Sequence, residues 1–186
     1  MSDDRPDVEE WLRQNVAAQP VAAARYELLD GEQIPMPPIT DAHTACVIRL
    51  TKLLGDAVGD EAILSIQNPL VLGEPSQPCP DVALLAPRTD GYSVGRVSPA
   101  DVLLLIEVSD TSFALTHDRG RKASYYARNG IAECWIVDLM SEQVLVHSTP
   151  ASGGYRDIRN LRRGATLSSS ALDSVNLTVA QVLDVA

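Results

Sequence analysis

Cysteine and histidine are scarce in this sequence, and neither is spaced for metal binding. The three cysteines, Cys46, Cys79 and Cys134, are far apart, and no CxxC pair occurs. This excludes a disulfide framework and a zinc knuckle. The three histidines are equally scattered, so a zinc site built from them is not expected.

Long hydrophobic runs and nucleotide-binding motifs are also absent. The apolar runs are short, such as Val102–Ile106, so a transmembrane helix is not expected. The first seven residues are acidic and lack the apolar region of a signal peptide, which favours a cytoplasmic location. Without a G-x-G-x-x-G, a P-loop or a G-x-S-x-G elbow, nucleotide-cofactor and serine-hydrolase functions lose their main support.

Basic residues are fewer than acidic residues, and they are unevenly distributed along the chain. The net charge is -10, which argues against a protein that coats DNA non-specifically. Residues 1–118 contain 7 Lys and Arg against 19 Asp and Glu, whereas residues 119–186 contain 8 against 6. Any contact with a polyanion is therefore expected in the C-terminal part, although ordinary solvated charge explains any single arginine there equally well.

The composition fits one globular domain. The 186 residues are 45% hydrophobic, enough for a sizeable core, and we expect residues 1–186 to form a single domain. Residues 1–20 are expected to be a helical extension, with the helix at Val8–Ala18. A hairpin at Tyr26–Ile34 is predicted by Asp30-Gly31, a strong turn signal, and Thr40–Ala57 has the apolar stripe of a helix.

The rest of the chain alternates between strand and helix patterns. Strands are expected at Ala62–Ile66, at Pro69–Leu72, from Asp81 onward, from Val102 onward, at Ile131–Leu139, at Gln143–Ser148 and at Tyr155–Ile158; helices are expected at Asp118–Asn129 and at Thr178–Val185. The apolar run from Val102 predicts a central strand that is covered on both faces. The fold class is therefore α/β, without a regular βαβ series.

Two carboxylates lie at the ends of predicted buried strands. Asp81 opens one apolar run and Glu107 lies near the end of another. If the two strands pair antiparallel, both carboxylates reach the same edge of the sheet, where burial requires compensation. Together with the Val108 carbonyl, they would form an oxygen-rich site suited to Mg²⁺ or Mn²⁺. Taken alone, Asp81 after a proline is better explained by a turn.

Lys122 lies on the predicted helix that follows these strands. It could orient or deprotonate a water molecule, or stabilise charge developing on a phosphate. The alternative is an i,i+4 pair with Asp118, which contributes about 0.3–0.5 kcal/mol on an exposed helix. Ser109 shares the face of Glu107 by strand alternation, and it could equally form a turn with the residues that follow.

These residues form an ordered set that resembles a known family. The set is Asp81, then Glu107-x-Ser109, then Asp118-x-x-x-Lys122-x-x-x-Tyr126, then Gly130-Ile-Ala-Glu-Cys-Trp-Ile-Val-Asp138, with Tyr26-Glu-Leu-Leu-Asp-Gly-Glu and Met36-Pro-Pro upstream, followed by His43. Taken alone, His43 is better explained as a capping or packing residue than as a ligand. The set is similar to the Uma-two family of endonucleases in the PD-(D/E)XK superfamily. The similarity extends from about Tyr26 to Val146.

The resemblance implies a fold and a set of roles. The fold would be restriction-endonuclease-like: a central mixed sheet flanked by helices, with an N-terminal helix and hairpin. The superfamily places a lysine two residues after the glutamate, where this chain has Ser109, and the resemblance implies that Lys122 supplies the amine instead. Glu27 resembles an upstream acid that assists the metal, and Asp118 and Tyr126 are candidate supporting residues.

The leading hypothesis is therefore a Mg²⁺- or Mn²⁺-dependent endonuclease that hydrolyses DNA. Asp81 and Glu107, with the Val108 carbonyl, would hold the metal, Lys122 would position the water, and Ser109 would support the site. A homodimer is expected because cutting two strands favours two sites. The alternatives are a catalytically silent binding module that retains the fold, and a metal-free hydrolase that uses the two carboxylates as acid and base.

Overall fold

The computed structural model of the protein describes residues 26–36, 38–72 and 76–184. The helix expected at Val8–Ala18 lies outside these residues. Within the described part of the chain, no helix is both long enough and apolar enough to cross a membrane.

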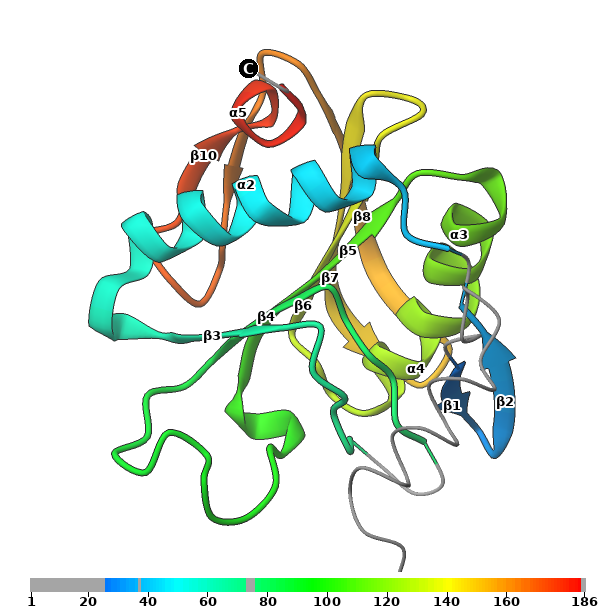
Figure 1. The fold of residues 1–186 in the computed structure, drawn as a ribbon, viewed down its shortest axis with the longest axis vertical. Coiled ribbons are helices and arrows are strands. Elements are labelled where there is room, and N and C mark those ends of the chain that lie inside the picture. Colours follow the sequence, from blue (N-terminus) through cyan, green and yellow to red (C-terminus); the bar gives the residue numbers. More distant parts are fainter. Residues whose placement is uncertain (1–25, 37, 73–75, 185–186) are drawn as a thin grey trace, which may run out of the picture.

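A six-stranded mixed sheet forms the centre of the molecule (Figure 1). Its order is β3-β4-β5-β6-β7-β8, with β3 at Ile63–Ile66, β4 at Val82–Leu85, β5 at Val102–Ser109, β6 at Glu133–Asp138, β7 at Gln143–Ala151 and β8 at Gly154–Arg162. Only β5 and β6 pair in parallel among these strands; the other neighbours are antiparallel. The mixed α/β class is confirmed.

Helices cover both faces of this sheet (Figure 1). One face carries α2 (Asp41–Val58), α5 (Val179–Leu183) and a small sheet of β9 (Thr166–Ser168) and β10 (Asn176–Thr178). The other carries α3 (Ser112–His117), the π-helical turn η3 (Asp118–Lys122), α4 (Ala123–Arg128) and the hairpin of β1 (Tyr26–Leu29) and β2 (Glu32–Pro35). Two 3₁₀ turns, η1 (Gly59–Glu61) and η2 (Pro99–Asp101), precede β3 and β5.

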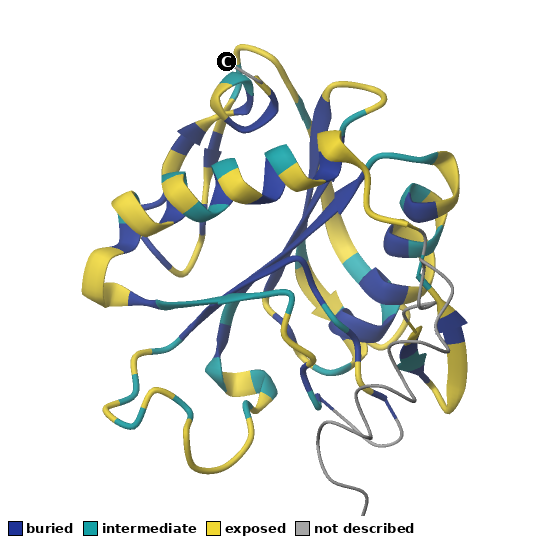
Figure 2. Cartoon of the chain, in the orientation of Figure 1, coloured by how far each residue is buried: buried dark blue, intermediate teal, exposed yellow. Residues whose placement is uncertain are grey.

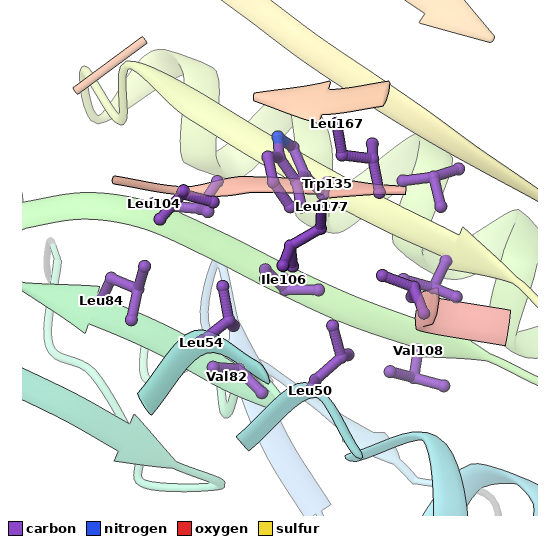
Figure 3. Close-up of a cluster of buried hydrophobic side chains, with 14 of the residues drawn as sticks. Leu50, Leu54, Val82, Leu84, Leu104, Ile106, Val108, Trp135, Leu167 and Leu177 are labelled. Carbon is purple, nitrogen blue, oxygen red and sulfur yellow. The ribbon is translucent and has the colours of Figure 1, made fainter. Parts of the chain in front are cut away.

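The central strands are buried on both faces, as the apolar run from Val102 predicts. Leu104 and Ile106 of β5 pack on the α2 side, whereas Leu105 between them packs on the α4 side. Trp135 of β6 lies beside Ile106 in register and is fully buried (Figure 3). Figure 2 shows the same continuous burial through the middle of the sheet. The site residues at the strand ends are therefore held by a rigid core.

The N-terminal hairpin turns where the sequence predicts. Asp30 and Gly31 have φ values of 52° and 78°, the left-handed pair that a two-residue hairpin turn requires and that Asp-Gly supplies at little cost. Register pairs Glu27 with Ile34, so Ile34 packs into the core while the hairpin also carries Glu27 inward.

One predicted strand and the start of one predicted helix are wrong. Pro69–Leu72 is not a strand; Leu70 donates its N–H to the Pro78 carbonyl, and Pro69 has no N–H to donate. The helix expected from Asp118 begins at Ser112 instead, because the Thr111 hydroxyl accepts the Ala114 N–H and caps it.

The C-terminal part is richer in strands than expected. The strand expected at Tyr155–Ile158 continues to Arg162, and the short strands β9 and β10 were not predicted. The terminal helix is shorter than expected, at Val179–Leu183, and it is capped by Thr178, whose hydroxyl accepts the Gln181 N–H.

Candidate active site

The antiparallel pairing of β4 and β5 brings the two predicted carboxylates together. Val82 pairs with Ile106, so Asp81, just before β4, lies beside Glu107, just after Ile106. Both line one small pocket, with a cavity volume of about 60 Å³, between the sheet, α2 and the α3–η3 segment. The expectation that they share an edge of the sheet is confirmed.

Asp81 is held by three hydrogen bonds. Its Oδ2 accepts the Val108 N–H at 2.8 Å and lies 3.1 Å from His43 Nε2, and its Oδ1 accepts the Gln67 side-chain amide at 3.0 Å. Burial alone would raise the pKa of Asp81, but the hydrogen bond and charge of His43, together with Lys122, lower it. Asp81 is therefore a carboxylate at neutral pH.

Glu107 is the most deeply buried acid of the pocket. Its Oε1 accepts the Tyr126 hydroxyl at 2.6 Å and lies 2.7 Å from Lys122 Nζ. Burial raises the pKa of Glu107 well above its usual range; the charge of Lys122 opposes this rise, and the nearby Asp118 and Asp81 carboxylates add to it. A further positive charge beside Glu107 would stabilise its ionised form.

Lys122 is a buried cation surrounded by acids. Only 3% of its side chain is exposed, and Nζ lies 2.7 Å from Glu107, 3.4 Å from Glu27 and 4.0 Å from Asp118. Burial would lower the pKa of Lys122, but these carboxylates raise it well above its usual range. The i,i+4 contact with Asp118 exists, yet it is the longest of the three and lies in the pocket rather than on an exposed helix face.

Ser109 contacts the pocket through Asp118. Its hydroxyl donates to Asp118 Oδ2 at 2.7 Å, so it orients an acid of the site rather than forming a turn with the next residues. Asp118 begins η3, a π-helical turn of the kind often found at functional sites. Burial raises the pKa of Asp118, which Lys122 and Ser109 partly offset.

Glu27 enters the pocket from the hairpin. Its Oε1 lies 2.8 Å from His117 Nε2, and its Oε2 accepts the Cys79 N–H at 3.3 Å. Burial would raise the pKa of Glu27, but the His117 hydrogen bond and the Lys122 charge lower it. Glu27 is thus a second carboxylate that pairs with Lys122. This pair connects β1 with the pocket.

Five of the predicted side chains line one pocket, together with His43, His117 and Gln67. The five are Glu27, Asp81, Glu107, Asp118 and Lys122. The remaining two predicted residues contact these acids, Ser109 through Asp118 and Tyr126 through Glu107. Sequence reasoning missed His117 and Gln67, and it included His43 in the family resemblance without giving it a role in the site. His43 was expected to cap or pack, although its place three residues after the Thr40 cap was a signal that it lies at the start of α2. No sequence signal pointed to Gln67.

The donor chemistry of the pocket fits a hard divalent cation. Asp81 and Glu107 offer carboxylate oxygens. Because the N–H and C=O of one strand residue point to the same side, the Val108 carbonyl faces Asp81 as its N–H does. Within the described residues no three His, Cys, Asp or Glu side chains form a metal cluster. Two carboxylates with a carbonyl suit Mg²⁺, which commonly uses one or two carboxylates and retains several waters.

Comparison with known proteins gives one family and one fold. The model of the Uma2 family, described as "Putative restriction endonuclease", matches residues 10–180. The crystal structure of "a putative nuclease belonging to DUF820" from Anabaena variabilis ATCC 29413 is similar, with a TM-score of 0.70 and 15% identity, covering 94% of this chain and 96% of that chain. That likeness shows the fold. No curated protein matches the chain.

Proposed function

Because the chain belongs to the Uma2 family, whose description is that of a restriction endonuclease, we propose that it is a divalent-metal-dependent endonuclease acting on DNA. The family resemblance seen in the sequence is confirmed, and nuclease-like function follows at that level. Metal dependence and DNA hydrolysis are the proposed refinements.

One observation carries this proposal: Lys122, a buried ammonium, lies 2.7 Å from Glu107 in a pocket that Asp81 also lines. A buried charge of either sign is costly unless it is paired. Carboxylates with a single amine, positioned by strand ends and a helix, match the chemistry of phosphodiester hydrolysis, which needs charge stabilisation at the phosphate.

The roles of the residues follow from their protonation and contacts. Asp81, Glu107 and the Val108 carbonyl would hold Mg²⁺ or Mn²⁺. When bound, the cation would lower the pKa of a water molecule and neutralise charge developing on the phosphate. Because the raised pKa keeps Lys122 protonated at neutral pH, Lys122 acts as a hydrogen-bond donor that positions the water or the phosphate, not as a base.

The remaining residues keep this arrangement in place. Ser109 orients Asp118, Tyr126 holds Glu107, and Glu27 shares the Lys122 charge. Removal of any of these contacts is expected to loosen the site without removing its reacting groups.

The same proposal includes that the protein is a cytoplasmic homodimer and that residues 1–186 form one domain. Two copies would present one pocket to each strand of a duplex. Light scattering on the purified protein tests the dimer: a mass near twice 20.0 kDa supports it, and a monomer at cleavage-active concentration contradicts it.

Cleavage assays test the function. Supercoiled, linear and single-stranded DNA are incubated with Mg²⁺, Mn²⁺ or EDTA and with wild type, Glu107→Gln or Lys122→Met. Asp138→Asn is the matched control, because Asp138 is a buried carboxylate at the end of the neighbouring strand and bonds to Gln143. We expect metal-dependent cleavage by wild type and control, and a loss of about 10²–10³ in rate for Lys122→Met.

Each rival predicts a different result. Cleavage that persists in EDTA contradicts the metal-dependent reaction and favours acid–base hydrolysis by the carboxylates. Absence of cleavage together with absence of metal binding favours a catalytically silent binding module.

A further inference from the structure

Strand β8 is an exposed edge of the central sheet. It pairs only with β7 in the sheet order, and five successive residues, Arg156–Asn160, are exposed. In Figure 2 this strand contrasts with the buried strands beside it. An edge strand of this kind presents both its side chains and its unpaired backbone groups to a partner.

The arginines of β8 differ from most other basic residues in having no acidic partner. Several surface cations form ion pairs: Lys52 with Asp56, Arg88 with Asp90, Arg121 with Glu32, Arg128 with Asp30 and Arg163 with Glu142. Among the described residues, Arg156, Arg159 and Arg162 make no such pair. Asp157 is the one acid on the strand. A protein of net charge -10 therefore exposes a strand that carries excess positive charge.

The sheet register connects this strand with the candidate active site. Ser109 pairs with Asp138, Asp138 with Gln143, and Gln143 with Arg162, so all four lie in one row. Residues directly opposite one another share a face, which places Arg162 on the face where Ser109 meets Asp118. Three strand spacings separate β5 from β8, roughly 14 Å, a distance that about four nucleotides of a strand span.

The arginines place positive charge on both sides of the exposed edge. Arg156, Arg159 and Arg162 follow one another at three-residue intervals, roughly 10 Å along the strand. Because side chains alternate along a strand, Arg159, which pairs with Val146 of the α2-side core, projects from the face opposite to that of Arg162. A polyanion that runs along the edge can contact both. The exposed Arg119 lies just after Asp118, and its charge reaches His147 on β7. It extends the positive surface from β8 toward the pocket.

We propose that β8, through Arg156, Arg159 and Arg162, binds the phosphate backbone of a nucleic-acid strand whose scissile bond lies in the pocket. The identity of this polyanion rests on the proposed nuclease function. Arginine suits the task because its guanidinium binds phosphate with two parallel hydrogen bonds. A second copy of the chain fits β8 less well, since antiparallel pairing of two β8 edges centred on Arg159 would set arginines against arginines.

The test separates phosphate binding from edge protection, because charged residues on an edge also prevent aggregation. The double variant Arg159→Glu/Arg162→Glu keeps the edge charged but reverses its sign. Arg159→Lys/Arg162→Lys retains the sign. The control Lys52→Glu/Arg88→Glu makes the same change in net charge on other surfaces.

Binding of a fluorescein-labelled DNA 20-mer, single-stranded and duplex, is measured in EDTA by anisotropy at several salt concentrations. The β8 reversal is expected to lower affinity about tenfold or more and to reduce the slope of log K against log salt by about 1.4–1.8, corresponding to two lost contacts. The lysine variant and the control should stay within about threefold of wild type.

Several outcomes overturn the inference. These are a wild type without affinity for either DNA, an unchanged slope in the β8 reversal, and a control that loses as much affinity as the β8 reversal. A reversal that alters the mass in light scattering but leaves affinity unchanged assigns β8 to contact between copies and also overturns it.

Hydrolysis of bis(4-nitrophenyl) phosphate, a diester too short to reach β8, separates this inference from the proposed function. The β8 reversal should leave its rate unchanged. If wild type cleaves no diester while the β8 reversal still loses DNA affinity, the nuclease proposal fails and the binding surface stands.

Discussion

At the scale of single residues, the site depends on how charge is compensated. Asp81 and Glu107 are neighbours in the pocket, yet the pKa of Asp81 is lowered and that of Glu107 is raised. The difference arises from their partners. Asp81 accepts hydrogen bonds from His43, Gln67 and a backbone N–H, whereas Glu107 is buried among further acids.

His43 is predicted to position Asp81. His43→Gln removes the contact at 3.1 Å to Asp81 Oδ2, which should lower divalent-metal affinity or cleavage about 10–100-fold. Calorimetry with Mn²⁺ and the cleavage rate are the measurements. His147→Gln is the control, because His147 is buried on β7 away from the pocket; equal losses in both variants would contradict a specific role.

His147 should make stability depend on pH. Burial lowers the pKa of His147 below its ordinary 6.5, and the Arg119 charge lowers it further. The unfolded chain therefore binds a proton at higher pH than the native state does. This contribution is complete above about pH 6.5 and is lost as pH falls through the folded pKa.

Urea unfolding at pH 7 and pH 5 measures this effect. The loss of unfolding free energy between the two values should be smaller in His147→Gln than in wild type, because the variant no longer takes up this proton on unfolding. The same loss in both proteins would show that His147 is not responsible.

At the scale of secondary-structure elements, the sequence predicts what depends on local pattern. The two apolar runs predict that Asp81 and Glu107 lie at the same end of an antiparallel strand pair. The φ preferences of Asp30 and Gly31 predict the turn that they form. The contacts of His43 and Gln67 with Asp81 could not be predicted, because they join segments that only the folded sheet brings together. The helix of the site was predicted from Asp118 rather than from Ser112, because the apolar pattern of the sequence does not reveal the cap at Thr111.

The Thr111 cap gives the prediction at this scale. Thr111→Ala removes the acceptor of the Ala114 N–H and should cost about 1 kcal/mol, a fall of about 2–4 °C in Tm for a chain of this size. Thermal unfolding measures it, with Thr111→Ser as the control that keeps the hydroxyl. A Tm of Thr111→Ala equal to that of wild type would mean that packing alone sets the start of the helix.

At the scale of the whole molecule, the two faces of the sheet have different roles. The α2 face forms a continuous apolar core around Leu104, Ile106 and Trp135 (Figure 3). The opposite face combines a second core with the buried acids and Lys122. The sequence predicted the two-sided cover of β5, but it could not predict that β8 forms the exposed edge, because strand order depends on long-range pairing.

The central claim is that Asp81 and Glu107 hold a divalent cation beside Lys122. A calorimetric titration of Mn²⁺ into wild type and Glu107→Gln, with Asp138→Asn as the control, tests it most directly. The account predicts binding to wild type and to the control, and loss of binding in Glu107→Gln. Mn²⁺ affinity in Glu107→Gln equal to that of wild type would contradict it.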